Sequence, residues 1–367
     1  MTPTSQDDLD ALRSTVRDFL EAKSGDADLR EPGFDRAVWA QLTGELGLTG
    51  LAIPEAYGGD GFGLVELGVV LEEMGRALVS APFFSSVVLA APALRATGDE
   101  AACTRYLPGI AAGTTTAALA VTEADGSWDP RRVTTGAVET SPGRWSLTGV
   151  KCFVIDGSTA DLLLVVAGTE TGLSLFAVDR TAPGVRAEPL RVLDATRPQA
   201  RVTFDAAPAV RVGEDGAGEL VFGPVLDVAA VCLAAEQAGG ARKVLETSAE
   251  YARTRHQFGR PIGSFQAVKH KCADMLVQVE LAEASAREAA RLHEEDPANL
   301  PAAAAVAHAC CSRAYLFAAM ENIQVHGGIG FTWEHPAHRH FRRAKSAQLL
   351  FGGPAADQER LLAALGV

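Results

Sequence analysis

The sequence predicts an α+β protein of several domains, arranged in the order helical, β, helical. Apolar residues recur at helical spacing up to about residue 116, and short β-favouring runs then alternate with turn residues. Long, alanine-rich helical stretches follow a glycine-rich linker. We therefore expect an N-terminal α-helical domain over 1–116, a middle β-barrel or sandwich domain over 117–214, and a C-terminal four-helix bundle over 215–367.

The N-terminal part has helix signals from its first residues. Ser5 precedes an apolar stripe and Asp8 follows three residues later, a pairing that resembles a capping box. The stripe consists of Leu9, Leu12, Val16 and Phe19, which share one helix face. Further helices are predicted over 35–46, 64–76, 79–96 and 100–112.

The middle and C-terminal parts differ in the length of their elements. Short strands are predicted over 144–147, 162–166, 173–178 and 201–204, with a linker over 213–218. Long helices are then predicted over 226–253, from about 264 onward, and over 302–325. Few breakers interrupt the first of them, apart from the pair Gly239-Gly240.

Composition excludes several classes of protein. Charged residues make up 22% of the 367 and the hydrophobic group 47%, which is typical of a folded chain. The net charge of −13 argues against nucleic acid as a partner. We see no apolar run of membrane-spanning length and no signal peptide, and we expect a cytoplasmic protein. Six scattered cysteines without CxxC spacing predict free thiols and no metal site.

Two motif blocks stand out in the last third of the chain, at 253–266 (RTRHQFGRPIGSFQ) and 324–334 (QVHGGIGFTWE). Basic residues cluster in the first block and again shortly after the second. Such clusters in an acidic protein fit a small phosphate-bearing ligand, although for one cluster alone a solvated helix face remains the simpler interpretation.

With these blocks, three further segments resemble the acyl-CoA dehydrogenase family over nearly the whole chain. Tyr57-Gly58-Gly59 resembles its N-terminal turn, and Val121-Thr122-Glu123 resembles the start of its flavin-binding β segment. Residues 149–155 (GVKCFVI) resemble the next such strand. The resemblance implies an FAD held between the β domain and the C-terminal bundle, with a dimer mate completing the site.

The resemblance also implies which residues bind FAD. Thr122 belongs to the flavin-binding segment, whereas Arg255, Gln257 and Phe258 match residues that reach across to the mate's FAD. Arginine offers a planar fork of donors to the doubly charged pyrophosphate. The alternative is that Arg255 caps the C-terminus of its own helix, where a cation is favoured.

The second block matches the family's contact on the adenosine side, through Gln324, Gly327 and Gly328. Glycines let a backbone approach a ligand closely, although they also commonly end helices, and both roles are compatible. We expect His326 to be packed or solvated rather than catalytic, and Trp333 to be structural.

The expected chemistry needs a base that this chain lacks at the usual places. Members of the family oxidise acyl-CoA thioesters to 2,3-enoyl products, with a carboxylate that removes the α-proton. The resemblance places the usual Glu at Gly352 and its minority location at Ala229, so the catalytic residue is unknown. Pro354 replaces a flavin-contacting Thr, and Trp128 takes the position of a Ser unless a one-residue shift brings Ser127 there.

Other acids are weaker candidates. Glu236 lies seven residues after Ala229 on the same helix face, about 10 Å away, and either serves function or forms a structural salt bridge. Asp125, Asp129 and Asp357 are expected to be loop acids.

Three hypotheses follow. In the first, the chain is a subunit that completes the FAD site of a second, Glu-bearing chain, as in actinobacterial sterol side-chain degradation, with electron-transfer flavoprotein as acceptor. In the second, it is a self-sufficient FAD-dependent oxidoreductase with a non-standard base or reaction. The third, a non-enzymatic assembly protein, is disfavoured by the retained motif blocks. The acyl group stays open.

Overall fold

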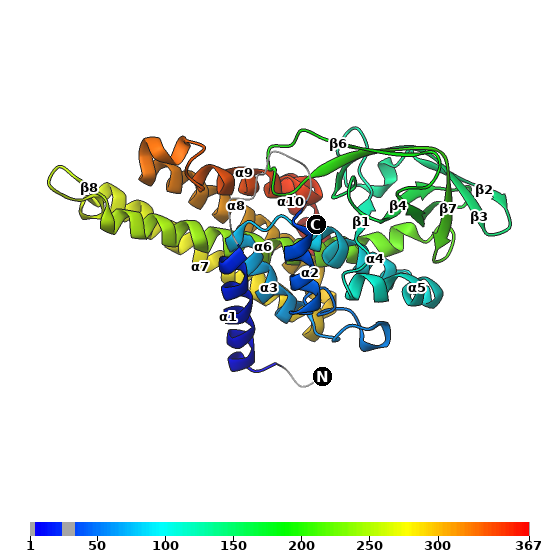
Figure 1. Ribbon diagram of the computed structural model, residues 1–367, viewed down its shortest axis with the longest axis horizontal. Helices are drawn as coiled ribbons and strands as arrows, with labels where there is room; N and C mark the ends of the chain where they lie inside the picture. Colours follow the sequence, from blue (N-terminus) through cyan, green and yellow to red (C-terminus); the bar gives the residue numbers. More distant parts are fainter. Residues whose placement is uncertain (1–3, 24–33, 367) are drawn as a thin grey trace. The chain divides into compact units, whose positions relative to one another are not determined.

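The computed structural model describes residues 4–23 and 34–366. The chain divides into two compact units. The bundle unit comprises Met1–Ala27, Leu64–Val79 and Ala230–Val367, and the barrel unit comprises Asp28–Gly63 and Ser80–Ala229. The predicted order of helices, strands and helices is confirmed (Figure 1). The three domain boundaries stay a prediction.

The N-terminal helices begin at the polar residues that favour helix starts. Ser5 Oγ accepts a hydrogen bond from the Asp8 N–H and donates one to the Asp8 carboxylate, as the capping pattern predicts. Asp35 and Asp99 cap the second and fifth helices through their carboxylates. The helices are α1 (Gln6–Lys23), α2 (Arg36–Gly44), α3 (Leu64–Ala77), α4 (Ala91–Ala96) and α5 (Glu100–Ala111), together with a 3₁₀ turn, η1 (Glu55–Tyr57), and a π-helix, η2 (Phe84–Ala90), which leads directly into α4.

The middle strands form a barrel rather than a sandwich. The sheet runs β4-β2-β3-β7-β5, and β5 pairs again with β4, which closes the ring. Val202, Phe204 and Phe176 are buried in its core. The strands are β1 (Ala117–Ala120), β2 (Gly136–Ser141), β3 (Arg144–Ile155), β4 (Leu162–Gly168), β5 (Leu173–Asp179), β6 (Val185–Pro189) and β7 (Gln199–Val212).

The C-terminal bundle has a core shared by four helices. Val244 of α6, Met275 of α7, Tyr315 of α8 and Ala344 of α9 belong to one buried cluster, and α10 packs on α8. The helices are α6 (Gly218–Thr254), α7 (Gln266–Glu295), α8 (Leu300–His326), α9 (Ala337–Gln348) and α10 (Gly353–Ala364).

The Gly239-Gly240 pair does not break α6. A Cβ at Gly239 would lie 1.8 Å from the carbonyl oxygen of Glu72 on α3, and one at Gly240 would lie 2.5 Å from Cζ of Tyr315 on α8. The two glycines therefore allow α3 and α8 to approach the α6 backbone closely.

Two helical stretches, Gly218–Thr254 and Pro297–Phe331, are long and apolar enough to cross a membrane by length and composition alone. Their most apolar windows are 67% and 56% buried within the protein, as core helices of bundles also are. The absence of a membrane span stays a prediction.

Candidate functional site

A short hairpin carries the first motif block. After α6 ends at Thr254, β8 (His256–Gln257) pairs with β9 (Arg260–Pro261), and the loop consists of Phe258 and Gly259. Both loop residues have positive φ, 54° and 78°, as primed two-residue hairpin turns require. Figure 1 shows this hairpin projecting beyond the ends of α6 and α7.

The predicted flavin contacts on this hairpin point away from the fold. Arg255, Gln257 and Phe258 are all exposed, and Phe258 reaches 92% exposure. Within the described part of the chain, the Arg255 side chain makes no ion pair or hydrogen bond, so it does not cap α6 by bonding its last carbonyls. A bulky aromatic residue with left-handed backbone and almost full exposure is costly for the isolated chain.

The second motif block ends α8. Gly327 has φ 64° and ψ −140°, a conformation that glycine alone adopts readily, and its N–H donates to the carbonyls of Ile323 and Gln324. The helix-stop interpretation of Gly327 is therefore correct. A Cβ added at Gly327 or Gly328 would meet no atom within 4 Å. The space beside both glycines is therefore open. The nearby side chain of Gln324 is exposed.

One aromatic contact brings the two blocks to the same end of the bundle. The ring of Tyr251, at the end of α6, stacks on that of His326, at the end of α8, with centroids 4.3 Å apart. His326 also contacts the carbonyl of Asn322 through Nδ1 at 2.8 Å. Burial lowers the pKa of His326, which fits the expectation that it is a packed residue.

In the barrel unit, Thr122 is bonded to the neighbouring strand. Its hydroxyl donates to the carbonyl of Cys152, whose N–H donates back to the carbonyl of Thr122 at 2.9 Å. Thr122 is 2% exposed, and its hydroxyl hydrogen is already donated to the Cys152 carbonyl. A flavin contact from this residue would therefore use the hydroxyl oxygen or the backbone.

Glu123 and Lys151 fix the same segment, a pairing that sequence reasoning missed. The buried Lys151 Nζ donates to the Val121 carbonyl at 2.8 Å and to Glu123 Oε1 at 2.9 Å. Burial opposes ionisation of Glu123, but hydrogen bonds from Thr134, Thr135 and Lys151 outweigh it and lower its pKa to about 2. Burial lowers the pKa of Lys151 to about 8, against the effect of Glu123. Both groups position the segment after β1 that contains Thr122.

The position that the resemblance assigns to the usual base lies in a left-handed turn. Phe351, Gly352 and Gly353 have φ values of 57°, 97° and 67°. A Cβ at Gly352 would lie 2.5 Å from that of Ala356. A side chain here would be strained by the backbone conformation and crowded by α10. Ala229, the minority position, is completely buried on α6.

Glu236 forms a structural ion pair. It is 4% exposed, and its Oε1 accepts a hydrogen bond from Arg343 Nη1 of α9 at 2.8 Å. Arg343 also donates through Nη2 to the carbonyl of Val79 at 3.1 Å. Of the two interpretations of Glu236, the salt bridge to a neighbouring helix is the one that the structure contains.

The expectation that Asp357 is a loop acid is wrong. It lies on α10, is 2% exposed, and both its carboxylate oxygens lie 2.9 Å from Nδ1 of the buried His308 on α8. The sequence carried only a weak signal for this pair: His308 is a lone polar position in an apolar stretch of α8, but Asp357 begins the polar run 357–360 on α10. Asp125 and Asp129 do lie in the loop before β2, paired with Arg132 and Arg131.

Trp128 is in the same loop and is 9% exposed. Its indole therefore fills space within the barrel unit, as a bulky side chain in place of a hydroxyl would. Ser127 is engaged locally, since its Oγ accepts the N–H of Asp129 at 3.2 Å.

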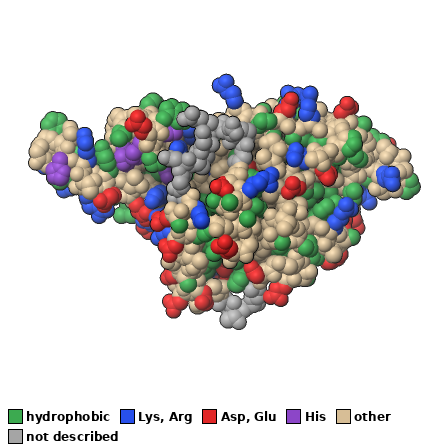
Figure 2. All heavy atoms as spheres, viewed as in Figure 1, with side chains coloured by type: hydrophobic (Ala, Val, Ile, Leu, Met, Phe, Trp, Pro, Cys, Tyr) green, Lys and Arg blue, Asp and Glu red, His purple; other side chains and the backbone are tan. Residues whose placement is uncertain are grey.

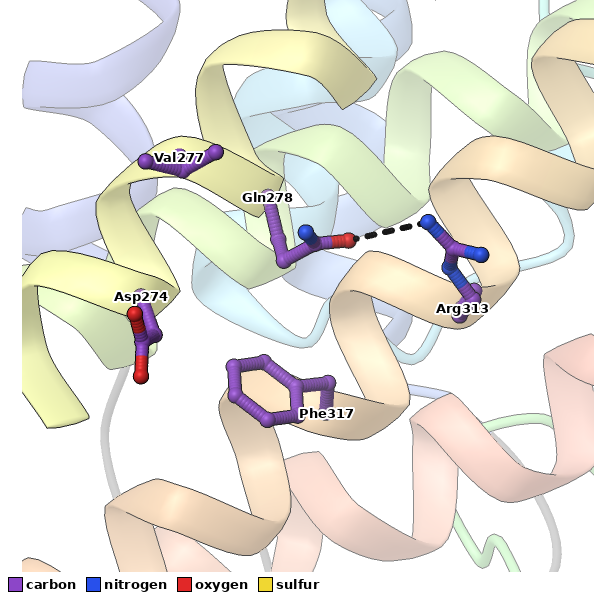
Figure 3. A pocket seen from close by; sticks show the side chains of 5 residues that line it. All are labelled: Asp274, Val277, Gln278, Arg313 and Phe317. Carbon is purple, nitrogen blue, oxygen red and sulfur yellow. Dashed lines mark hydrogen bonds between the residues drawn. The ribbon is translucent and has the colours of Figure 1, made fainter.

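A separate open pocket of about 390 Å³ lies between α7 and α8 (Figure 3). Val277 and Phe317 give it apolar walls, and Arg313 donates to Gln278 across it at 3.4 Å. Asp274 completes the lining. None of the residues that the sequence predicts as site residues lines this pocket.

Known proteins match the chain from end to end. Residues 6–114, 118–207 and 216–364 match the N-terminal, middle and C-terminal domains of acyl-CoA dehydrogenases. The acyl-CoA dehydrogenase IpdE2 of Mycobacterium tuberculosis is 34% identical, over 95% of this chain and 94% of its own.

Two solved structures are similar across their whole length. One is a Tcur3481-Tcur3483 steroid ACAD variant, with 33% identity, a TM-score of 0.87 and 98% coverage of both chains. The other is the ChsE4-ChsE5 complex of Mycobacterium tuberculosis, with 31% identity, a TM-score of 0.89, and coverage of 100% and 99%. The chain belongs to the acyl-CoA dehydrogenase family, a family of flavoprotein oxidoreductases.

Proposed function

We propose that this chain is one subunit of a two-chain acyl-CoA dehydrogenase that carries out 2,3-dehydrogenation of a CoA thioester. In this role it completes the FAD site of a Glu-bearing partner and supplies no base of its own. The observation that carries the proposal is an asymmetry. The groups that would reach a partner's cofactor are exposed, whereas the positions that would act on a substrate within this chain carry no usable carboxylate.

The hairpin end of the bundle unit fits the adenosine and pyrophosphate part of FAD. Arg255 offers an uncommitted guanidinium, and Gln257 and Gln324 offer exposed amides. Phe258 would form an apolar wall. Neither Gly327 nor Gly328 has a neighbour that would obstruct a ligand, as the open space beside them indicates.

The chain's own candidates for a base fit poorly. Gly352 is held at a φ of 97°, and Ala229 is fully buried without an acidic group. The nearest alternative on α6, Glu236, is held by Arg343. The contact with Arg343 holds the Glu236 carboxylate between α6 and α9 and away from a substrate carbon. We therefore propose that the α-proton is removed by the partner's carboxylate.

Relatives support the finer features of the proposal. IpdE2 is named an acyl-CoA dehydrogenase, and ChsE4-ChsE5 is a complex of two named chains. A structure named for an electron transferring flavoprotein of Acidaminococcus fermentans also matches, with 27% identity and a TM-score of 0.91. We propose a cytoplasmic heterotetramer in fatty acid or sterol degradation, with an electron-transfer flavoprotein as acceptor.

When bound, FAD would accept the hydride from the β-carbon of the substrate. The residues of this chain would bind and orient it. Arg255 would neutralise pyrophosphate charge, and the hairpin would cover the cofactor from the side of the neighbouring subunit.

The test is to produce the chain alone and together with a dehydrogenase chain that carries the usual catalytic Glu. We expect flavin only in the co-produced complex, with one FAD for each two chains. Arg255→Ala should lower the flavin content of the complex. Arg253→Ala is the matched control, because Arg253 lies two residues earlier, is also exposed and already pairs with Glu250.

A homodimer of this chain that holds stoichiometric FAD and oxidises an acyl-CoA would overturn the proposal and favour a self-sufficient enzyme. In that case Glu236→Gln would be informative. Anaerobic bleaching by acyl-CoA that disappears in this variant would identify Glu236 as the base.

A further inference from the structure

The C-terminal helix α10 is attached to the bundle through one buried side chain. Of its twelve residues, only Gly353 and Asp357 are buried, and glycine has no side chain. Ala356, Arg360 and Leu361 are partly buried, and the rest of the helix is exposed. Apolar burial therefore contributes little to holding α10 on α8, and a helix of this length is marginally stable by itself in water.

The buried side chain of α10 contacts a buried imidazole. Both carboxylate oxygens of Asp357 lie 2.9 Å from Nδ1 of His308 on α8. Histidine side chains reach the surface at the hairpin end of the bundle unit (Figure 2), whereas His308 is completely buried. Among the described residues, the second ring nitrogen of His308, Nε2, has no hydrogen-bond partner. The carboxylate is thus the polar contact that fixes α10 on α8, and its loss would leave a buried polar group unsatisfied.

The chain just before α10 has the features of a hinge. Three consecutive residues, Phe351, Gly352 and Gly353, have positive φ. The two glycines can adopt other conformations at little cost, and Phe351 is strained in the conformation it has. The helix α10 also begins without a side-chain cap, since Gly352 occupies its N-cap position. The turn can therefore change conformation without disturbing the helix on either side.

We propose that α10 is a latch, which swings off α8 about the 351–353 turn while the rest of the bundle stays folded. The contact between His308 and Asp357 keeps the latch closed. Opening exposes His308 and removes Ala356, whose Cβ lies 2.5 Å from the place of a side chain at Gly352. The latch thereby controls the space around the turn to which the resemblance assigns the usual base. The inference does not rest on the proposed function, because it concerns one chain and no cofactor.

Hydrogen exchange measured by mass spectrometry on the full-length chain tests the latch. In the wild type, the amides of 357–364 should exchange by local opening, about 100-fold faster than those of 304–319 on α8. Asp357→Ala should accelerate exchange over 357–364 by about 30-fold and leave α8 unchanged, because the pair holds α10 alone. Glu359→Ala is the matched control, since Glu359 is an exposed acid on the same helix, and it should exchange like the wild type.

Two further variants show whether the pair itself closes the latch. Asp357→Asn keeps an oxygen that can accept from His308 Nδ1, so its exchange rate should lie between those of the wild type and Asp357→Ala. His308→Ala should accelerate α10 as Asp357→Ala does, and the double variant should be little faster than either single one. Trypsin cleavage after Arg360 gives an independent measure, because proteolysis of a transiently opened helix follows the population of the open form.

Three results would overturn the latch. Equal exchange rates for α10 and α8 in the wild type would mean that α10 opens only when the whole bundle unfolds. Equal acceleration of both helices in Asp357→Ala would mean that the pair stabilises the entire bundle. Wild-type exchange of α10 in Asp357→Ala would mean that the pair does not hold the helix. None of these results bears on the proposed function, which the flavin content of the complex tests separately.

Discussion

Glu236 and Arg343 form a buried ion pair between α6 and α9, with Oε1 and Nη1 2.8 Å apart and side-chain exposures of 5% and 3%. Glu236, which lies two turns along α6 from Ala229 on the same face, is thus paired with a cation. A buried carboxylate on an alanine-rich helix, which from sequence alone is compatible with catalysis, is thereby a structural element.

We expect Glu236→Gln to destabilise the chain by about 3 kcal/mol, because it leaves the Arg343 charge buried without its counterion. Urea unfolding of the isolated chain measures this loss. The double variant Glu236→Gln/Arg343→Met should recover part of it, since both charges are then removed. Unchanged stability combined with loss of turnover in the complex would instead identify Glu236 as a catalytic group.

Much of the fold follows from local pattern, and the order of helices and strands is one example. The stripe beginning at Leu9 and the strand runs of the barrel are local signals, because burial on one face repeats with the period of the element. Ring closure is not local. β4 and β5 form a local hairpin, but closure also needs β5 to pair with β7 and β4 with β2, which lie 35 and 32 residues apart at the pairs Phe176–Arg211 and Gly136–Gly168, so the sequence does not distinguish a barrel from a sandwich.

The site, like the fold, is predictable from sequence only where its residues are close together along the chain. The motif blocks predict that Arg255 and Phe258 lie together, since they are neighbours in sequence. The contacts of Lys151 with Glu123 and of His308 with Asp357 join residues 28 and 49 positions apart. A single sequence contains no signal for such pairs beyond the unusual presence of a charged residue among apolar ones.

Restoring an acid at the usual position should not create an active site. Gly352→Glu would place a residue with a Cβ at a φ of 97°, and that Cβ would lie 2.5 Å from the Cβ of Ala356. We expect a loss of about 1–3 kcal/mol in unfolding free energy and no exchange of substrate α-protons with solvent. Ala355→Glu is the control, because that exposed position adds the same charge without the strain. Wild-type stability with α-proton exchange would show that the turn adapts.

The two glycines of the second block should respond differently to alanine. Gly327→Ala should destabilise the isolated chain by about 1–3 kcal/mol, because φ 64° with ψ −140° is accessible almost only to glycine. Gly328→Ala should leave the isolated chain unchanged, since its Cβ would have no neighbour within 4 Å. If a cofactor lies against Gly328, the variant complex should nevertheless retain less FAD. Full flavin content in Gly328→Ala would argue against a close approach there.

Glu123 should make the barrel unit sensitive to acid. Its pKa in the folded chain is about 2, below the ordinary value of 4.5, so its stabilisation is complete above pH 4.5 and is lost as the pH falls toward 2. The shift corresponds to about 3 kcal/mol before solvent screening. Because the carboxylate is partly solvated, we expect Glu123→Gln to lower the unfolding free energy by about 1–2 kcal/mol at pH 7 and to change it little near pH 2. Glu170→Gln, at an exposed loop position, is the control and should leave the unfolding free energy unchanged at every pH.

Because Lys151 loses its counterion in Glu123→Gln, the double variant with Lys151→Met should be more stable at pH 7 than the single one. A Glu123→Gln penalty that does not change between pH 7 and pH 2 would mean that packing, rather than charge, explains the role of Glu123.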